Sequence, residues 1–248
     1  MLLRRRGRIG HAGLTLPQQV QALFAAGEQG AWYDPSDLST LFQDSAGTTP
    51  VTAVDQPVGL MRDKSGRGNH ASQATDTRRP LLKQDASGFY HLLFDGVDDY
   101  LRATFEIAQP IDRISGLSFI TWNQFRTVLG GVTAIGGLLQ QGSVSLDLRV
   151  NSGSSTLPVS VPMLTPSVIT ERHNGASSRI ALNSGAYATG NGGATLPGGI
   201  TIASNEVAAA FRDLRFYGSV MRGGATALSD SQIAVIRRYA AGLCGVAL

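Results

Sequence analysis

The sequence predicts an all-β fold, and three features support that prediction. Its 248 residues include 30 glycines and many Ser, Thr and Asn residues, which are typical of frequent turns between short strands. The apolar runs between residues 114 and 150 are short and bounded by glycine. From Val144 to Val150, apolar residues alternate with Ser, Asp and Arg, as in a strand with one solvated face. With 42% hydrophobic residues the chain can bury a sizeable core, so we expect one sandwich.

Residues 1–30 are predicted to form a segment distinct from the sandwich. Residues 1–13 have no apolar period, so we expect order there only when a partner holds them. This arm could be a solvated tail, a peg into another protein or a segment facing nucleic acid. The basic side chains that could attach it are Arg4, Arg5, Arg6 and Arg8.

A short amphipathic helix is expected after the arm. Thr15 is a suitable N-cap, and Pro17 fits the first turn of a helix. The apolar side chains that would share one face are Val20, Leu23 and Phe24. This face predicts packing against the domain or a neighbouring subunit.

Residues 31–105 predict short strands around two polar turns. Trp32 and Tyr33 are expected in the core or at an interface, or alternatively as a platform for a sugar ring. A glycine-rich loop is expected at 63–70, where glycines suit positive φ. The remaining expected elements are a helical turn at 38–42, strands at 58–61, 90–94 and 100–105, and an Asp-Gly turn at 95–96.

Residues 106–248 predict further strands and a closing helix. Ser229 is the expected N-cap of that helix, in which Ile233 and Ile236 have helical spacing. The strands are expected at 117–122, 127–129, 132–139, 144–150, 159–161, 166–170, 178–182, 200–203 and 211–216.

Several segments carry a resemblance to a known family. They are WYDPSDLSTLF (32–42), DKSGRGNHA (63–71), FDGVDDYL (94–101), RFYGSV (215–220) and ALSDSQIAVIRRYAAG (227–242). Over roughly residues 31–243 the chain resembles laminin-G-like domains of the concanavalin A-like lectin/glucanase class. The closest resemblance is to the version found in phage tail and other virion proteins.

The resemblance implies a concanavalin A-like jelly-roll β-sandwich at residues 31–248, with short N- and C-terminal helices and attachment through residues 1–30. It implies a non-enzymatic structural protein of a phage tail or baseplate, which serves assembly and host-surface glycan contact. The implied partners are other tail or baseplate proteins, bacterial surface polysaccharide and copies of the chain itself, by analogy in a trimer. A dedicated carbohydrate-binding adhesin and a polysaccharide-degrading enzyme are the alternatives.

Charge, cysteine content and hydropathy bear on other classes. The net charge of +3 is concentrated in the arm, so nucleic-acid binding is not expected. Cys244 is the single cysteine, so no intrachain disulfide can form, and we expect its side chain to be buried. No apolar run has the length of a signal peptide or of a membrane span, roughly 18 residues. We therefore expect synthesis in the host cytoplasm without a signal peptide, and no membrane partner.

Polar loops supply the candidate binding residues. The candidate ligand-binding residues are Asn69, His70, Trp122, Asn151, His173, Asn174 and Tyr187. Core packing is the alternative for Trp122. His70 and His173 each adjoin an Asn in an expected loop, so we expect them to face solvent or form hydrogen bonds, whereas His91 is expected to be packed in a strand.

Calcium is the one metal considered, and no other cofactor is expected. Asp63, Asn69 and Asp98 offer the oxygen ligands that Ca²⁺ prefers. Because these residues have no regular ligand spacing, the alternative is that their side chains cap turns. No His or Cys spacing predicts zinc.

No catalytic residue is predicted. A glycosidase needs two carboxyl groups about 5 to 9 Å apart, and the glucanase relatives of the family carry a Glu-x-Asp-x-Glu repeat that this chain lacks. The four glutamates are scattered, and adjacent Asp98 and Asp99 would point to opposite faces of a strand. No Gly-x-Ser-x-Gly sequence is present. We therefore expect a protein that is not an enzyme.

Overall fold

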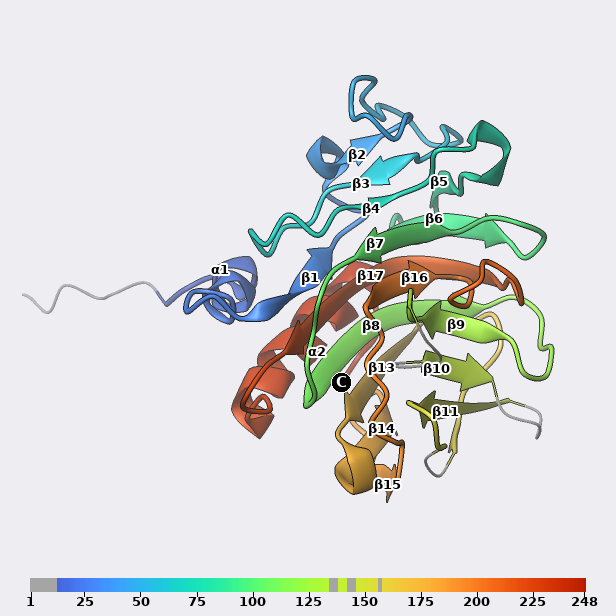
Figure 1. The fold of residues 1–248 in the computed structure, drawn as a ribbon. Helices are drawn as coiled ribbons and strands as arrows, with labels where there is room; N and C mark the ends of the chain where they lie inside the picture. The colour runs from blue at the N-terminus through green and yellow to red at the C-terminus, as the bar shows by residue number, and fades with distance from the viewer. Residues whose placement is uncertain (1–12, 134–137, 142–145, 156–157) are drawn as a thin grey trace, which may run out of the picture.

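The computed structural model describes residues 13–133, 138–141, 146–155 and 158–248. Two antiparallel sheets face each other in a sandwich, and a helix lies near each end of the chain (Figure 1). The all-β, concanavalin A-like sandwich predicted from the sequence is confirmed. Below, the outer face of a sheet is the face that points away from the other sheet.

The spatial order of the strands interleaves distant parts of the chain. Sheet A runs through β15 (Ala188–Gly190), β14 (Ser178–Leu182), β13 (Ser167–His173), β8 (Ile111–Phe119), β17 (Asp213–Gly223), β6 (Tyr90–Asp95) and β5 (Leu81–Gln84), and β1 (Gln29–Tyr33) also pairs with β17. Sheet B runs through β12 (Val159–Ser160), β11 (Asp147–Asn151), β10 (Leu138–Gln141), β9 (Thr127–Gly130), β16 (Gly199–Ile202), β7 (Leu101–Thr104), β4 (Ala71–Ser72), β3 (Leu60–Met61) and β2 (Leu41–Phe42). Three short 3₁₀ turns are described, η1 (Leu38–Thr40), η2 (Asp76–Arg78) and η3 (Gly175–Ser177).

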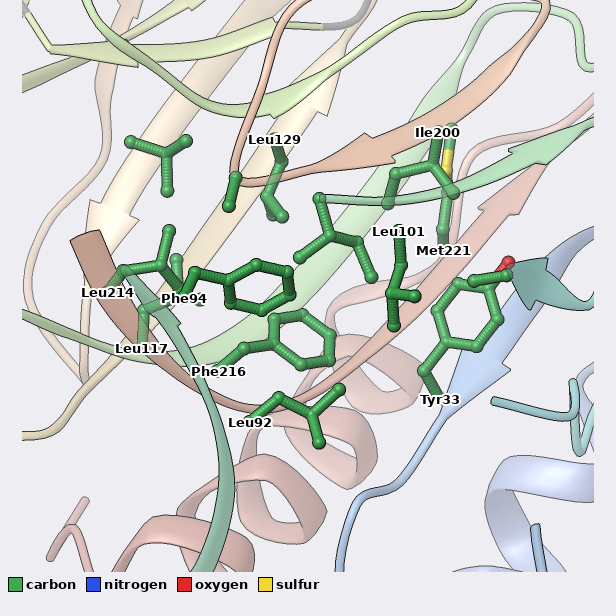
Figure 2. Close-up of a cluster of buried hydrophobic side chains, with 14 of the residues drawn as sticks. Tyr33, Leu92, Phe94, Leu101, Leu117, Leu129, Ile200, Leu214, Phe216 and Met221 are labelled. Atoms are coloured by element: carbon green, nitrogen blue, oxygen red, sulfur yellow. The ribbon is translucent and has the colours of Figure 1, made fainter. Parts of the chain in front are cut away.

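Alternation along the strands builds the core between the sheets. The rings of Phe94 on β6 and Phe216 on β17 lie close together at its centre (Figure 2). Sheet A adds Leu92, Leu117 and Leu214, and sheet B adds Leu101, Leu129 and Ile200, all fully buried. Burial of each such side chain stabilises the fold by roughly 1.5–3 kcal/mol.

A second hydrophobic layer covers part of the outer face of sheet A. It is formed by α1 (Leu16–Ala22) and α2 (Asp230–Cys244) with β1, and Trp32 meets Tyr239 edge to face at 5.3 Å between ring centroids. The apolar face predicted for the first helix is buried here, through Val20, Leu23 and Phe24. That prediction is therefore confirmed.

Both predicted helix caps are confirmed. Thr15 and Gln18 form a reciprocal capping box at the start of α1, and Ser229 and Gln232 form another at the start of α2. Helix α2 ends at Cys244 and is capped by Gly245, whose φ of +68° is a left-handed conformation that favours glycine.

Some expectations differ from the structure or fall outside it. Of the strand expected at 132–139, residues 132–133 form a bend, residues 134–137 lie outside the described residues, and residues 138–139 belong to β10. The division of the chain at residue 30 stays a prediction. The four arginines of the arm lie outside the described residues, as does Val144. No helix in the described ranges is long and apolar enough to cross a lipid bilayer.

Candidate functional site

A groove of about 940 Å³ opens on the outer face of sheet A, beside the C-terminal end of α2. This volume falls in the range of small-molecule binding sites, about 300–1,000 Å³. We call it the outer-face groove. Its lining residues are 83–87, Phe89, His91, Leu93, Ile120, 164–166, Asn183, Arg215, Tyr217 and 244–247.

Strand alternation places polar side chains on the groove floor. Leu92 and Phe94 on β6 point into the core, so His91 and Leu93 point outward. On β17, Arg215 projects outward between core residues and is paired in register with Leu93 of β6. The floor therefore combines a cation with apolar and aromatic surface.

Asp85 organises the β5–β6 end of the groove. One of its oxygens accepts the backbone N–H groups of Ser87 (2.9 Å) and Phe89 (3.0 Å), and the other accepts the Tyr217 hydroxyl (3.2 Å). Burial and the Asp85 carboxylate raise the pKa of Tyr217 well above its ordinary value. Tyr217 is therefore a neutral hydrogen-bond donor at pH 7.

His91 is neutral at pH 7. Burial lowers the pKa of its imidazole, and the positive charge of Arg215 adds to that effect. The ring lies 5.2 Å from that of Tyr217. The expectation that His91 is packed in a strand is confirmed, since the residue is 4% exposed.

Residues after α2 form one wall. A Cβ atom on Gly245 would come within 2.5 Å of Cε2 of Phe89, so the bare glycine backbone lets the Phe89 ring approach closely. Cys244 is buried as predicted, and its thiol donates to the carbonyl of Ala240 (3.2 Å). Burial raises the pKa of this thiol to about 12, so it is not a nucleophile at neutral pH.

The groove has the chemistry of a binding site. Among its described lining residues Asp85 is the one carboxylate, and its two oxygens already accept hydrogen bonds. Hydrolysis of a glycosidic bond by the usual route requires two carboxyl groups flanking that bond. The described residues can therefore hold a polar ligand but do not supply that pair.

The glycine-rich loop 63–70 is tied to β1. Asp63 accepts the backbone N–H groups of Trp32 (2.8 Å), Ser65 (2.8 Å) and Asn69 (3.0 Å). The Asn69 side-chain amide donates to a carbonyl of β1, and Nδ1 of His70 accepts the N–H of Asp63 (3.0 Å). These bonds match the turn-capping alternative for Asp63.

Asp98 lies in the turn between β6 and β7. Its carboxylate, with those of Asp95 and Asp99, forms a group whose ligand atoms lie within 4.8 Å of one another, and it also pairs with Arg78 at 3.4 Å. This turn and loop 63–70 lie on opposite sides of the view in Figure 1. The structure therefore does not bring Asp98 together with Asp63 and Asn69, and calcium binding stays a prediction.

The expectation that Asp98 and Asp99 diverge is wrong. Both precede β7, in a turn that Asp95 caps by accepting the backbone N–H groups of Val97 (2.8 Å) and Asp98 (3.3 Å). Because turn residues do not follow strand alternation, the carboxylates converge. Burial and the charge of Asp95 raise the pKa of Asp99 to about 6.

Asn151 is the last residue of β11 and Asn174 directly follows β13, so each begins a loop. Asn151 accepts the N–H of Gly153 (2.9 Å), and the segments after the two asparagines meet where Gly192 donates to Gly175 (3.0 Å) and accepts from Ser152. Both loops are at the surface, as expected for contact residues. Whether they bind a ligand stays a prediction.

The aromatic side chains among the predicted ligand-binding residues, Tyr187 and Trp122, already contact other side chains of the domain. Guanidinium groups of Arg179 and Arg237 lie 4.1 and 5.0 Å from the ring centroid of Tyr187. Trp122 is partly buried against the core and meets Phe119 edge to face at 6.1 Å. This contact agrees with the core alternative for Trp122.

His173 does not lie in a loop or face solvent, and of the two expected roles it has the hydrogen-bonding one. Strand β13 extends through this residue, and the side chain is fully buried. Its Nδ1 lies 2.8 Å from Oγ of Ser152, and its Nε2 lies 3.1 Å from Oε2 of Glu171, which pairs with Arg113 at 2.7 Å. Burial lowers the pKa of His173, so the imidazole is neutral.

The hydrogen-bonded side chains of Ser152, His173 and Glu171 are arranged like a hydrolase catalytic triad, but a substrate cannot reach them. All three side chains are fully buried between the sheets. Although burial opposes ionisation, Arg113 and His173 hold the pKa of Glu171 below its ordinary value. The cluster is therefore an ionised core pair with a neutral histidine, and it is closed to substrate.

The comparisons support the fold. No protein-family model and no curated protein matches the sequence. A GH54 α-L-arabinofuranosidase soaked with a cyclic sulfate inhibitor has a TM-score of 0.65 at 14% identity, over 91% of this chain and 65% of that chain. An arabinofuranosidase complexed with arabinofuranosyl-α-1,2-xylobiose has a TM-score of 0.54 at 14% identity, over 76% and 51%. For Trypanosoma rangeli sialidase in complex with sialic acid, the TM-score is 0.53 at 14% identity, over 86% and 33%.

At these identities the similarity shows the fold alone, a lectin-like sandwich of the kind found in glycosidases. The chain spans 65% of the length of the arabinofuranosidase chain. The activities in those names belong to those proteins.

Sequence reasoning missed the outer-face groove. Its residues come from segments more than 160 positions apart, and no short-range spacing joins Lys83 to Ala247. The sequence signal that could have indicated it is the alternation of side chains along the two strands, which places His91 and Arg215 on the face opposite their apolar neighbours.

Proposed function

We propose that this chain is a non-catalytic, saccharide-binding β-sandwich of a phage tail or baseplate, serving assembly and host-surface contact. The observation that carries the binding function is the outer-face groove, which combines a cation with aromatic and hydrogen-bonding side chains on a lectin-like fold. The virion setting rests on the family resemblance of residues 31–243.

The groove offers what sugar rings require. Phe89 is partly exposed and provides apolar ring surface, and sugars commonly stack on such surface while their hydroxyls meet polar edges. Asn183 uses its carbonyl oxygen to accept the N–H of Val168 (2.8 Å). Its amide nitrogen has no partner in the described part of the chain and is left to donate to a ligand.

Binding without hydrolysis is favoured over the enzyme alternative. The carboxylate cluster of Asp95, Asp98 and Asp99 is not among the residues that line the groove. Within the groove, Asp85 lacks a second carboxylate among the described residues. A bound polysaccharide would therefore be held without the acid and base that cleavage needs.

The test is a glycan-array screen of the purified chain, with and without calcium, together with its mass by light scattering. We expect specific binding to bacterial surface saccharides by an oligomer, and no release of reducing ends from the bound polysaccharides. Absence of binding by a well-folded chain would overturn the saccharide-binding function and favour assembly alone. Turnover of a polysaccharide would overturn the non-catalytic assignment.

A further inference from the structure

We infer that the outer-face groove selects acidic saccharides, whose carboxylate pairs with Arg215. This inference rests on the proposed saccharide-binding function and specifies its ligand class. Arg215 lies on the groove floor and is only partly buried. Among the described residues, its guanidinium has no hydrogen-bond or ion-pair partner.

None of the other charged groups of the groove forms an ion pair with Arg215 in the part of the chain that the structure describes. Lys83, on the neighbouring β5, pairs with Asp55 outside the groove. Asp85 uses its oxygens to hold its own turn and the Tyr217 hydroxyl. His91 is neutral at pH 7, and so is the Cys244 thiol from α2. Asp85 keeps its negative charge, but no ion pair joins it to Arg215 among the described residues, so Arg215 is the groove cation left to meet a ligand.

A carboxylate is the ligand group that fits this cation. The planar guanidinium presents parallel N–H donors that match the two oxygens of a carboxylate. Leu93 on β6 is paired with Arg215 and keeps apolar surface beside it, which reduces competition from water. Uronic and nonulosonic acids carry such a carboxylate directly on the sugar ring, so the hydroxyls can reach Asn183 while the carboxylate meets Arg215.

The probes are matched pairs that differ in their carboxylate charge. Trigalacturonate is compared with its methyl ester, and sialyllactose with lactose, on the same array as neutral and acidic bacterial polysaccharides. Poly-glutamate is included because its carboxylates test for an acidic peptide as the ligand. The best acidic ligand is then titrated calorimetrically against the wild type, Arg215→Gln, Arg215→Lys and Arg126→Gln.

Arg126→Gln is the matched control. It removes the same charge from an exposed arginine that does not line the groove. We expect acidic members to bind and their neutral partners to bind much more weakly. We expect Arg215→Gln to weaken binding about tenfold or more, Arg215→Lys to have a smaller effect and Arg126→Gln to have none.

Several results would overturn the inference. Equal binding of acidic and neutral partners would leave saccharide binding intact and remove the acidic preference. If Arg215→Gln binds the acidic saccharide with wild-type affinity, Arg215 does not recognise the carboxylate. Preferential binding of poly-glutamate would assign the groove to acidic peptides. Failure to bind any saccharide on the array would remove the proposed function itself. If Arg215→Gln does not fold, Arg215→Lys is the test, because it keeps the charge but lacks the paired N–H donors of the guanidinium group. An affinity of Arg215→Lys for the acidic saccharide equal to that of the wild type would then contradict the proposal.

Discussion

Asp99 illustrates how one side chain can work against the stability of a turn. Its carboxylate is only 6% exposed and lies within 4.8 Å of those of Asp95 and Asp98. Burial and repulsion raise its pKa from 3.8 to about 6. The folded state therefore binds this proton more tightly than the unfolded chain, and the resulting stability is present below pH 3.8 and lost as the pH rises through 6.

Replacement of Asp99 by Asn should raise stability at neutral and alkaline pH. The amide oxygen can still accept the N–H of Asp95, as the carboxylate does at 3.1 Å, but carries no charge. We expect a gain of about 1 kcal/mol at pH 8 after allowance for screening by water, and little or no gain at pH 4. Urea unfolding at the two pH values measures the difference.

Asp76→Asn is the control for this comparison. Asp76 is exposed and pairs with Arg79 on the surface at 2.6 Å, an arrangement that contributes little to stability. Its removal should change stability by less than Asp99→Asn does at pH 8. An Asp99→Asn variant that is less stable than the wild type at pH 8 would contradict the repulsion argument.

Among the elements, the helices were the most predictable because their signals are local. The side chains of Thr15 and Ser229 cap helices within three residues of themselves, so the sequence alone placed both starts. Strand ends depend on distant partners. Strand β13 reaches His173 because β8 pairs with it there, and nothing beside Asn174 in the sequence indicates that pairing.

The candidate site was less predictable for the same reason. Alternation along β6 and β17 indicates which side chains face outward, but sequence order does not say that these strands are neighbours. Loop composition drew the sequence prediction toward Asn69, Asn151 and Asn174. The groove instead lies over strands, where the covering helix ends.

The end of α2 is the element boundary on which the groove depends. Gly245→Ala would place a Cβ in a left-handed conformation and against the Phe89 ring. We expect a loss of at least about 1 kcal/mol in unfolding free energy and weaker saccharide binding, because Phe89 must move. Urea unfolding and calorimetric titration with the best array ligand measure both effects.

Gly242→Ala provides the matched comparison on the same helix. Gly242 lies inside α2, and a Cβ added there would meet no atom within 4 Å. This variant should gain about 0.5–1 kcal/mol from helix propensity and keep wild-type binding. Equal stability losses in the two variants would show that the conformation of Gly245 is not what matters.

At the scale of the whole molecule, sheet A separates two environments. One face is buried against sheet B, and the other is shared between the helical layer and the outer-face groove. The groove therefore has a rigid strand floor and a wall that depends on a helix end. This division lets ligand contacts vary on one face without disturbing the core between the sheets.

The proposed attachment of the N-terminal arm can be separated from folding. Deletion of residues 2–13 retains Thr15, which caps α1, and the buried side chains Val20 and Phe24. We therefore expect an unchanged melting temperature and unchanged saccharide binding, but loss of incorporation into phage particles. Incorporation is measured by quantitative detection of the chain in purified particles when the truncated form replaces the full-length form.

A second variant tests whether charge is responsible. Replacement of Arg4, Arg5, Arg6 and Arg8 by Gln keeps the length of the arm and removes its positive charge. If the arm pairs with acidic groups of a tail or baseplate protein, this variant should be lost from particles as the deletion is. High ionic strength during assembly should lower incorporation of the wild type toward that of the variant, because salt screens the charges that the variant lacks. Normal incorporation of the deletion variant into particles would contradict attachment through the arm. If the deletion variant is lost from particles but the Gln variant is incorporated normally, the arm attaches through contacts other than charge.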